Sequence, residues 1–163
     1  DHLSATMMEE FKMPRPSARI DVALVNGEMT GFEIKSDRDT LGRLSSQVPA
    51  FSKFFDRVTL VTTSRHVALA KTKIPDWWGL IVFSESHGFK VLRAPRLNKH
   101  VDIPSLLFAL SKNELLSVAR LSGTVLSAAT KKEEMVFHLT SSISHANIRN
   151  LAREVIKSRI AVC

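Results

Sequence analysis

The chain has one cysteine, no tyrosine and no long apolar run among its 163 residues. The single cysteine, Cys163, excludes an internal disulfide framework and is typical of a protein in a reducing cytoplasm. No stretch approaches the roughly 18 apolar residues of a membrane helix, and the chain lacks the basic start and apolar stretch of a signal peptide. We therefore expect a soluble, cytoplasmic globular protein without a membrane partner.

Basic residues outnumber acidic ones, with 23 Lys and Arg against 16 Asp and Glu and a formal net charge of +7. This balance favours a polyanionic partner such as nucleic acid, although charge alone is a weak indicator. Hydrophobic residues make up 44% of the chain, which is enough for a sizeable core. The length predicts one domain, or one domain with a small appendage.

Two segments around Asn26-Gly27 show the period-two pattern of strands. Apolar side chains occupy even positions on both sides of the turn, namely Ile20, Val22, Leu24, Phe32 and Ile34. This alternation predicts two half-buried strands whose even-numbered side chains face the core. Residues paired across an antiparallel hairpin share a face, so their numbers must add to an even sum. We expect a three-residue loop with Gly27 left-handed, or a bulge near Gly31.

The same register places Asp21, Glu33 and Lys35 together on the other face of the hairpin. Two converging carboxylates repel each other, so such a pair usually holds a hard cation through its oxygen atoms. A neighbouring lysine adds a positive donor that can offset the charge developing on a phosphate. The three side chains are typical of a phosphodiesterase. The alternative is an exposed ion pair of Glu33 and Lys35, which would contribute little to stability.

The sequence of Asp21, a hairpin and Glu33-Ile34-Lys35 resembles the signature of the PD-(D/E)XK nucleases, which have a restriction-endonuclease-like fold. The downstream segment Gln47-Val48-Pro49-Ala50-Phe51 is similar to the QxxxY element of the RecB-like branch, with Phe where Tyr is usual. The run GFEIKSDRDTLGRLSSQ is also similar to a small bacterial and phage branch of the superfamily. Ile20 stands where the name-giving Pro would be, a common departure. The resemblance covers about residues 9 to 83.

The resemblance implies an α/β protein with an αβββαβ core around a mixed sheet, followed here by a helical C-terminal extension. It implies that Asp21 and Glu33 bind Mg²⁺, for which Mn²⁺ can substitute, with the Ile34 carbonyl as a further ligand. Lys35 would stabilise the pentacovalent charge or position the attacking water. Gln47 would support these residues by reaching back to the strands, or would be a surface amide.

The first helix is expected at residues 3–12, because their composition is helix-forming, Ser4 can act as an N-cap and Pro14 follows. In the nuclease family a glutamate on this helix often completes the metal site, and Glu10 is the better match, with Glu9 as the alternative. The pattern also predicts a central strand at 58–63 and strands at 79–83 and 89–93. Helices are expected from about Leu41 to Phe51, kinked or split by Pro49, and at 65–71.

Other polar and aromatic residues have two interpretations. A lone histidine, His66, could touch the site but is more often structural, and no second ligand stands at zinc spacing. The Trp77-Trp78 pair could stack on unpaired bases, although wedging the sheet edge fits better. Basic residues that could contact phosphates are Arg19, Arg38, Arg43, Lys131, Lys132, Arg149 and Arg153.

A composition shift near Pro95 and Pro104 divides the chain into a nuclease-like core at 1–103 and a helical subdomain at 104–163. The second part has eight Lys and Arg against four Asp and Glu. Its central segment, KNELLSVARLSGTVLSAATKKEEMVFHL, is faintly similar to the helix-loop-helix of SAP-type DNA-binding modules. A subdomain that packs on the core fits better.

These observations predict a Mg²⁺-dependent nuclease that hydrolyses phosphodiester bonds of DNA. The main alternative is a non-catalytic nucleic-acid-binding or regulatory module on the same scaffold, and an interaction protein has the least support. Mutually repelling carboxylates favour the enzyme, because a binding role has no need of them. The sequence leaves open the cleavage polarity, the strand preference and the oligomeric state, a homo-oligomer included.

Overall fold

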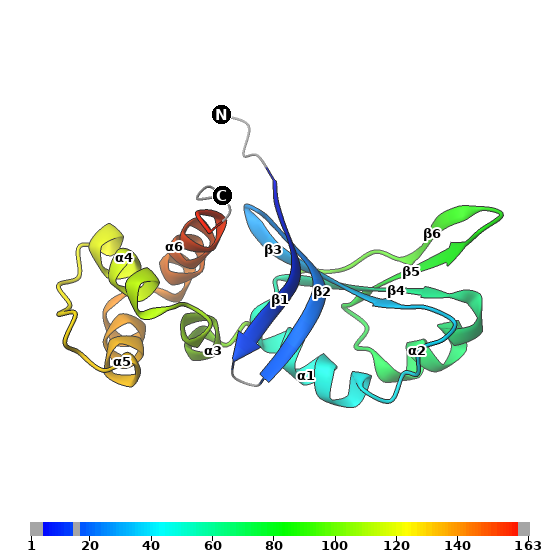
Figure 1. Ribbon diagram of the computed structural model, residues 1–163, viewed down its shortest axis with the longest axis horizontal. Coiled ribbons are helices and arrows are strands. Elements are labelled where there is room, and N and C mark those ends of the chain that lie inside the picture. The colour runs from blue at the N-terminus through cyan, green and yellow to red at the C-terminus, as the bar shows by residue number, and fades with distance from the viewer. Residues whose placement is uncertain (1–4, 15–16, 160–163) are drawn as a thin grey trace.

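The computed structural model describes residues 5–14 and 17–159. Its centre is a six-stranded mixed sheet in which the strands lie side by side in chain order, from β1 to β6. Strands β3, β4 and β5 are parallel to one another, and the other neighbouring strands are antiparallel. Helices α1 and α2 lie on one side of the sheet, and four C-terminal helices gather at one end (Figure 1).

The element bounds follow the chain in order. The strands are β1 (Thr6–Pro14), β2 (Ser17–Asn26), β3 (Glu28–Lys35), β4 (Arg57–Thr63), β5 (Gly79–Ser84) and β6 (Gly88–Arg93). The helices are α1 (Leu44–Phe54), the short 3-10 helix η1 (Ser64–His66), α2 (Val67–Lys73), α3 (Ile103–Phe108), α4 (Lys112–Ser122), α5 (Lys132–Ser142) and α6 (His145–Lys157). The strand, helix and C-terminal helical segments expected after residue 17 are confirmed, and β4 lies centrally in the sheet.

The β2–β3 hairpin has the even-sum register that parity requires. Val25 pairs with Met29 and Asn26 with Glu28, so the turn centres on Gly27, which has the left-handed φ of 67°. The prediction that even-numbered side chains face the core is wrong for β3, however. On β3 the buried side chains are the odd-numbered Met29, Glu33 and Lys35, while Ile34 is 49% exposed. Helix α1 covers the odd face, which the strand pattern alone does not reveal.

Residues 6–14 form an edge strand, so the expected helix at 3–12 is wrong for its described part. Met8, Phe11 and Met13 are buried side chains of β1 and pair with β2. Helix propensity is a weak preference that tertiary pairing overrides. The order β1-β2-β3-α1-β4 is present, but no helix precedes it within the described residues.

Side chains along β1 and β2 alternate between the buried and the exposed face of the sheet, and this alternation is interrupted at Glu10 and at Asp21. On one side Phe11 pairs with Ile20, and on the other Met8 pairs with Ala23, and all four are buried. On each strand two residues therefore lie between consecutive buried side chains, where a regular strand has one. Glu10 takes a φ of 50°, an uncommon conformation for a residue with a side chain. This irregularity is why Ala23 is fully buried and the expected Val22 is not.

An aromatic cluster fills the space between α1 and the sheet. Trp78 is fully buried and stacks on Phe51 with ring centroids 6.1 Å apart. It is therefore a core residue and is not available to stack on bases. Helix α1 runs through Pro49 without being split. The other rings of this cluster are Phe11, Phe54 and Phe55.

The C-terminal helices pack onto the core through the buried carboxylate of Asp56, between α1 and β4. Its side chain accepts hydrogen bonds from the Met29 amide at 2.6 Å and from Arg153 Nη2 at 2.9 Å, and it also binds Arg149. The Asp56 carbonyl accepts from the Asn98 amide at 2.7 Å. One residue thus ties the hairpin, the segment after β6 and α6 together.

In the described part of the chain, no helix is long and apolar enough to cross a membrane.

We expect Asp56→Ala to lower the free energy of unfolding by about 3 kcal/mol or more, because two arginines and an amide lose a buried acceptor. Asp76→Ala is the matched control. Asp76 also pairs with an arginine, Arg93, but its side chain is 90% exposed, so its loss should change stability by less than about 1 kcal/mol. Urea denaturation of both variants at neutral pH measures this difference, and equal losses would contradict the role of Asp56.

Candidate functional site

Strands β2 and β3 separate at the point where Asp21 stands. Their ladder ends at the pair Val22 and Phe32. Two residues further along β3, the amide of Ile34 donates to Asp21 Oδ2 at 2.7 Å. The aspartate side chain thus accepts the hydrogen bond that a backbone carbonyl of a paired strand would otherwise accept. This fixes the Asp21 carboxylate beside Glu33 and Lys35.

Glu33 and Lys35 project from β3 beneath α1, with only 1% and 2% of their surface exposed. Glu33 Oε1 accepts from Lys35 Nζ at 2.5 Å and from Gln47 Nε2 at 2.6 Å. Gln47 lies on α1, so the helix reaches back to the strand as the resemblance implied. Its contact is with the glutamate. The interpretation of Glu33 and Lys35 as an exposed surface pair is wrong, because both are buried.

Burial dominates the electrostatics of this cluster. It raises the pKa of Glu33 above its ordinary value, while the hydrogen bond and charge of Lys35 lower it. The negative charge of Asp21 raises the pKa further, and the Gln47 hydrogen bond lowers it. The two carboxylates are therefore near enough to repel each other.

Two oxygen atoms in the cluster are buried and have no hydrogen-bond partner, Glu33 Oε2 and Gln47 Oε1. Leaving a buried acceptor unpaired is costly, especially on a charged group. Carboxylate oxygen is the ligand that Mg²⁺ prefers, and Mg²⁺ commonly uses one or two carboxylates and keeps several waters. The described residues include no group of three or more His, Cys, Asp or Glu placed to hold a metal. Asp21 and Glu33 are thus the two carboxylates that this cluster offers to a cation.

The structure does not add Glu10 to this cluster. Its backbone lies opposite Asp21 between two β1–β2 pairs. Its carboxylate ion-pairs with Arg19 at 3.1 Å, where both side chains are more than half exposed. The expectation that a glutamate on a first helix completes the metal site depended on a helix that is a strand here. Glu9, the alternative, is exposed and pairs with Val22.

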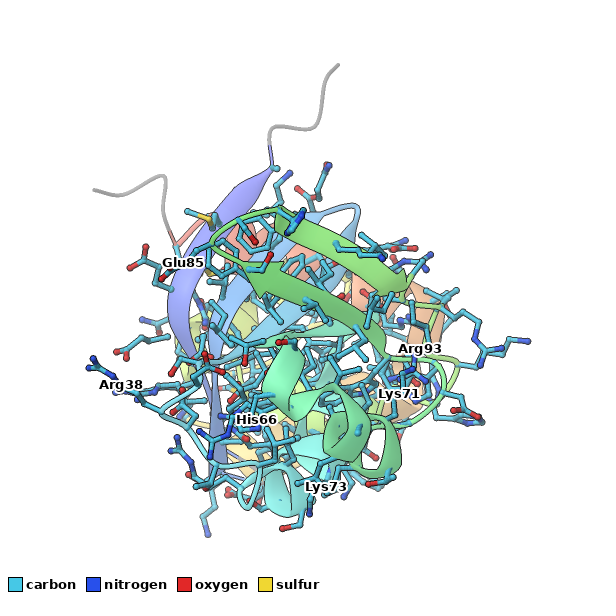
Figure 2. The ribbon with its side chains drawn as sticks, turned by 90° about the vertical axis from the view of Figure 1, so that its right-hand side faces the viewer. Arg38, His66, Lys71, Lys73, Glu85 and Arg93 are labelled. Carbon is cyan, nitrogen blue, oxygen red and sulfur yellow. The ribbon has the colours of Figure 1, made fainter. Side chains whose placement is uncertain are left out.

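The loop from Ser36 to Arg43 carries the exposed Arg38 and Arg43 past the end of β3. Asp39 Oδ2 accepts from the amide and the hydroxyl of Ser36, at 2.8 and 2.6 Å, which lowers the pKa of Asp39. His66 is buried and its Nε2 lies 3.1 Å from the Ser36 carbonyl. This contact favours the structural interpretation of His66. Figure 2 shows Arg38 at the outside of the molecule, away from His66.

Three of the four basic residues that were expected to contact phosphates from the C-terminal helices are engaged inside the protein. Arg149 and Arg153 bind the buried Asp56. Lys132 Nζ donates to the Phe108 carbonyl at 2.9 Å. These three residues thus hold the helices in place, and Lys131 is the one of the four that is exposed. Charge counting detects basic residues but not the buried acceptor that binds them.

Comparison with known proteins gives one family. The family model described as Bacteriophage P4 protein cII matches residues 1–161. The chain belongs to this family. It is 30% identical over 162 residues to Protein cII of Enterobacteria phage P4, a match that covers 95% of this chain and 60% of the phage protein. The chain thus spans about 60% of the length of this curated relative.

A solved structure is also similar to this member of the cII family. It is the SPO1766 protein of unknown function from Silicibacter pomeroyi, with 22% sequence identity and a TM-score of 0.44. The match covers 58% of this chain and 62% of that protein.

The raised pKa of Glu33 predicts a distinct pH dependence of stability in this cII family chain. A carboxyl group whose pKa is raised by folding binds its proton more tightly in the folded state, so its contribution to the free energy of unfolding falls as pH rises above about 4.3. Glu33→Gln removes that proton exchange. We expect the unfolding free energy of the wild type, minus that of Glu33→Gln, to decrease from acid to neutral pH. Urea denaturation across this range tests it, and an increase would contradict the assignment.

Proposed function

We propose that this chain is a divalent-metal-dependent nuclease of the PD-(D/E)XK type that hydrolyses DNA phosphodiester bonds. The supporting observation is the buried, unpartnered Glu33 Oε2, beside the charge of Asp21 and within the same cluster as Lys35. A buried carboxylate that already has two donors on one oxygen, and keeps the other oxygen free, is suited to a cation.

The roles follow from the contacts. Asp21 and Glu33 would bind Mg²⁺ or Mn²⁺, which when bound polarises a phosphate oxygen and lowers the pKa of water. Gln47 fixes Glu33 by occupying Oε1, so that Oε2 stays available. Lys35 stabilises negative charge on the phosphate. Asp21 is the less buried carboxylate, so a phosphate approaches the cluster from its side.

A second candidate has its own supporting observation. The Lys35 ammonium already lies 2.5 Å from Glu33 and neutralises it within a nearly fully buried pair. Such a pair can be a purely structural part of a non-catalytic nucleic-acid-binding module. Removing one member of a buried pair is strongly destabilising whatever the function, so stability alone does not distinguish the two candidates.

Cleavage and metal binding distinguish them. We expect the wild type to degrade single-stranded or plasmid DNA with Mg²⁺ or Mn²⁺ but not with EDTA. Glu33→Gln should abolish cleavage and weaken Mn²⁺ binding measured by calorimetry. Lys35→Met should retain Mn²⁺ binding yet lower turnover by about a hundredfold or more, the scale of one lost electrostatic stabiliser. Glu10→Gln is the control and should cleave as the wild type does.

Each variant is first checked for its fold by circular dichroism and urea denaturation, because the pair is buried. A folded wild type that binds DNA, shows no Mn²⁺ binding and cleaves no substrate form would support the non-catalytic module. Loss of cleavage in Glu10→Gln would instead return Glu10 to the site and contradict its assignment as a surface ion pair.

A further inference from the structure

A groove of about 930 Å³ opens at the carboxyl ends of β3, β4 and β5. These are the three consecutive parallel strands of the sheet. In open α/β sheets this edge is where ligands characteristically bind, and the volume is in the range of small-molecule sites. The residues that line it come mainly from the three strand ends, at 34–38, 61–64 and 83–86, together with Phe89 of β6.

Two exposed aromatic rings form one wall of the groove. Phe83 and Phe89 pair across the β5–β6 turn, with ring centroids 4.9 Å apart and planes tilted by 48°. Phe89 is 71% exposed and Phe83 is 39% exposed. Ile34, on the face of β3 opposite to Glu33 and Lys35, adds an exposed aliphatic side chain to the lining. The groove thus offers flat apolar surface that no described residue covers.

The rim of the groove carries balanced charge and several hydroxyl groups. Arg38 is exposed, and its guanidinium has no hydrogen-bond or ion-pair partner among the described residues. The Asp37 carboxylate accepts from the Thr63 hydroxyl, and the Asp37 carbonyl accepts from Arg65 at 2.9 Å. Glu85 lies at the turn, on the same side of the molecule as Arg38 in Figure 2. The charged residues that line the groove are thus Lys35, Asp37, Arg38 and Glu85, and this balance suits one phosphate better than a long polyanion.

We propose that this groove binds an unpaired nucleotide of a nucleic-acid strand. The base stacks on Phe89 and Phe83, because aromatic side chains stack on bases of any identity. The phosphate pairs with the free guanidinium of Arg38. Serine and threonine hydroxyls and the Asp37 carboxylate, which line the groove, supply hydrogen-bonding groups for the edge of the base.

This site goes beyond the proposed nuclease and does not rest on it. The groove contains neither Asp21 nor Glu33, although Lys35, the last residue of β3, lines it as well. If the nuclease proposal and the groove proposal are both correct, the substrate is a strand with an unpaired segment. Binding without metal tests the groove alone, and cleavage by the Glu33 variant tests the other site alone.

The first test measures binding of a short, dye-labelled single-stranded oligodeoxythymidine by fluorescence anisotropy in EDTA. Phe89→Ala should weaken the affinity by about tenfold, the scale of one lost base stack. Phe137→Ala is the matched control, because Phe137 is also 70% exposed but lies on α5. Equal affinities of the Phe89 and Phe137 variants would overturn the proposal.

A second test reports stacking and the phosphate contact separately. An oligonucleotide with a single 2-aminopurine should lose fluorescence on binding to the wild type, and this quenching should be absent with Phe89→Ala. Arg38→Gln should reduce the salt dependence of binding by about one phosphate contact, a slope change near 0.7 for a single strand. Arg120→Gln, on the exposed side of α4, should leave the slope unchanged.

Further measurements distinguish an unpaired nucleotide from a duplex or a second copy of the chain as the occupant of the groove. Competition by millimolar AMP in the wild type and not in Phe89→Ala would support the groove as a nucleotide site. Tighter binding of a duplex than of the single strand, unaffected by Phe89→Ala, would overturn it. A dimer in ultracentrifugation that dissociates on Phe89→Ala, with unchanged oligonucleotide affinity, would also overturn it, because the groove would then be an interface between copies of the chain.

Discussion

A buried carboxylate with one satisfied oxygen is the constraint around which the candidate site is arranged. Glu33 is almost fully buried, and its charge is tolerated there because Lys35 and Gln47 donate to Oε1. Those donors come from β3 itself and from α1, so the packing of α1 on the sheet is inseparable from the charge state of the cluster. A buried ion is stable only when its geometry is excellent and its partners are in place.

A second buried carboxylate, at the opposite end of the sheet, is also held by several hydrogen-bond donors. Asp56 is buried and receives bonds from a hairpin amide and from two arginines of α6. The C-terminal helices are thereby fastened to the core by the charges that sequence counting assigns to DNA. Arginine suits this task because its planar guanidinium can satisfy a carboxylate with little loss of conformational freedom. The protein thus uses part of its excess positive charge for architecture, and Arg38 is among those left for a ligand.

Sequence reasoning was reliable where a local rule determined the outcome. Parity of the hairpin and the left-handed Gly27 followed from the residues alone, and so did the proximity of Asp21, Glu33 and Lys35. It failed where distant residues decide. The helix expected at 3–12 is a strand because β2 offers a partner, and the buried face of β3 is set by α1. The phase change at Glu10 and Asp21 has no sequence signal, and neither has the aromatic pair of Phe83 and Phe89 before the topology places their strand ends together.

Ile34 belongs to both halves of the molecule. Its amide holds Asp21 on one side, and its side chain lines the groove on the other. A shift of β3 by a fraction of an ångström would therefore move a carboxylate and a groove wall together. By thermodynamic reciprocity, whatever binds one side with a preferred strand position changes the affinity of the other side by the same factor. Ile34 thus links the binding sites on the two faces of the sheet as well as separating them.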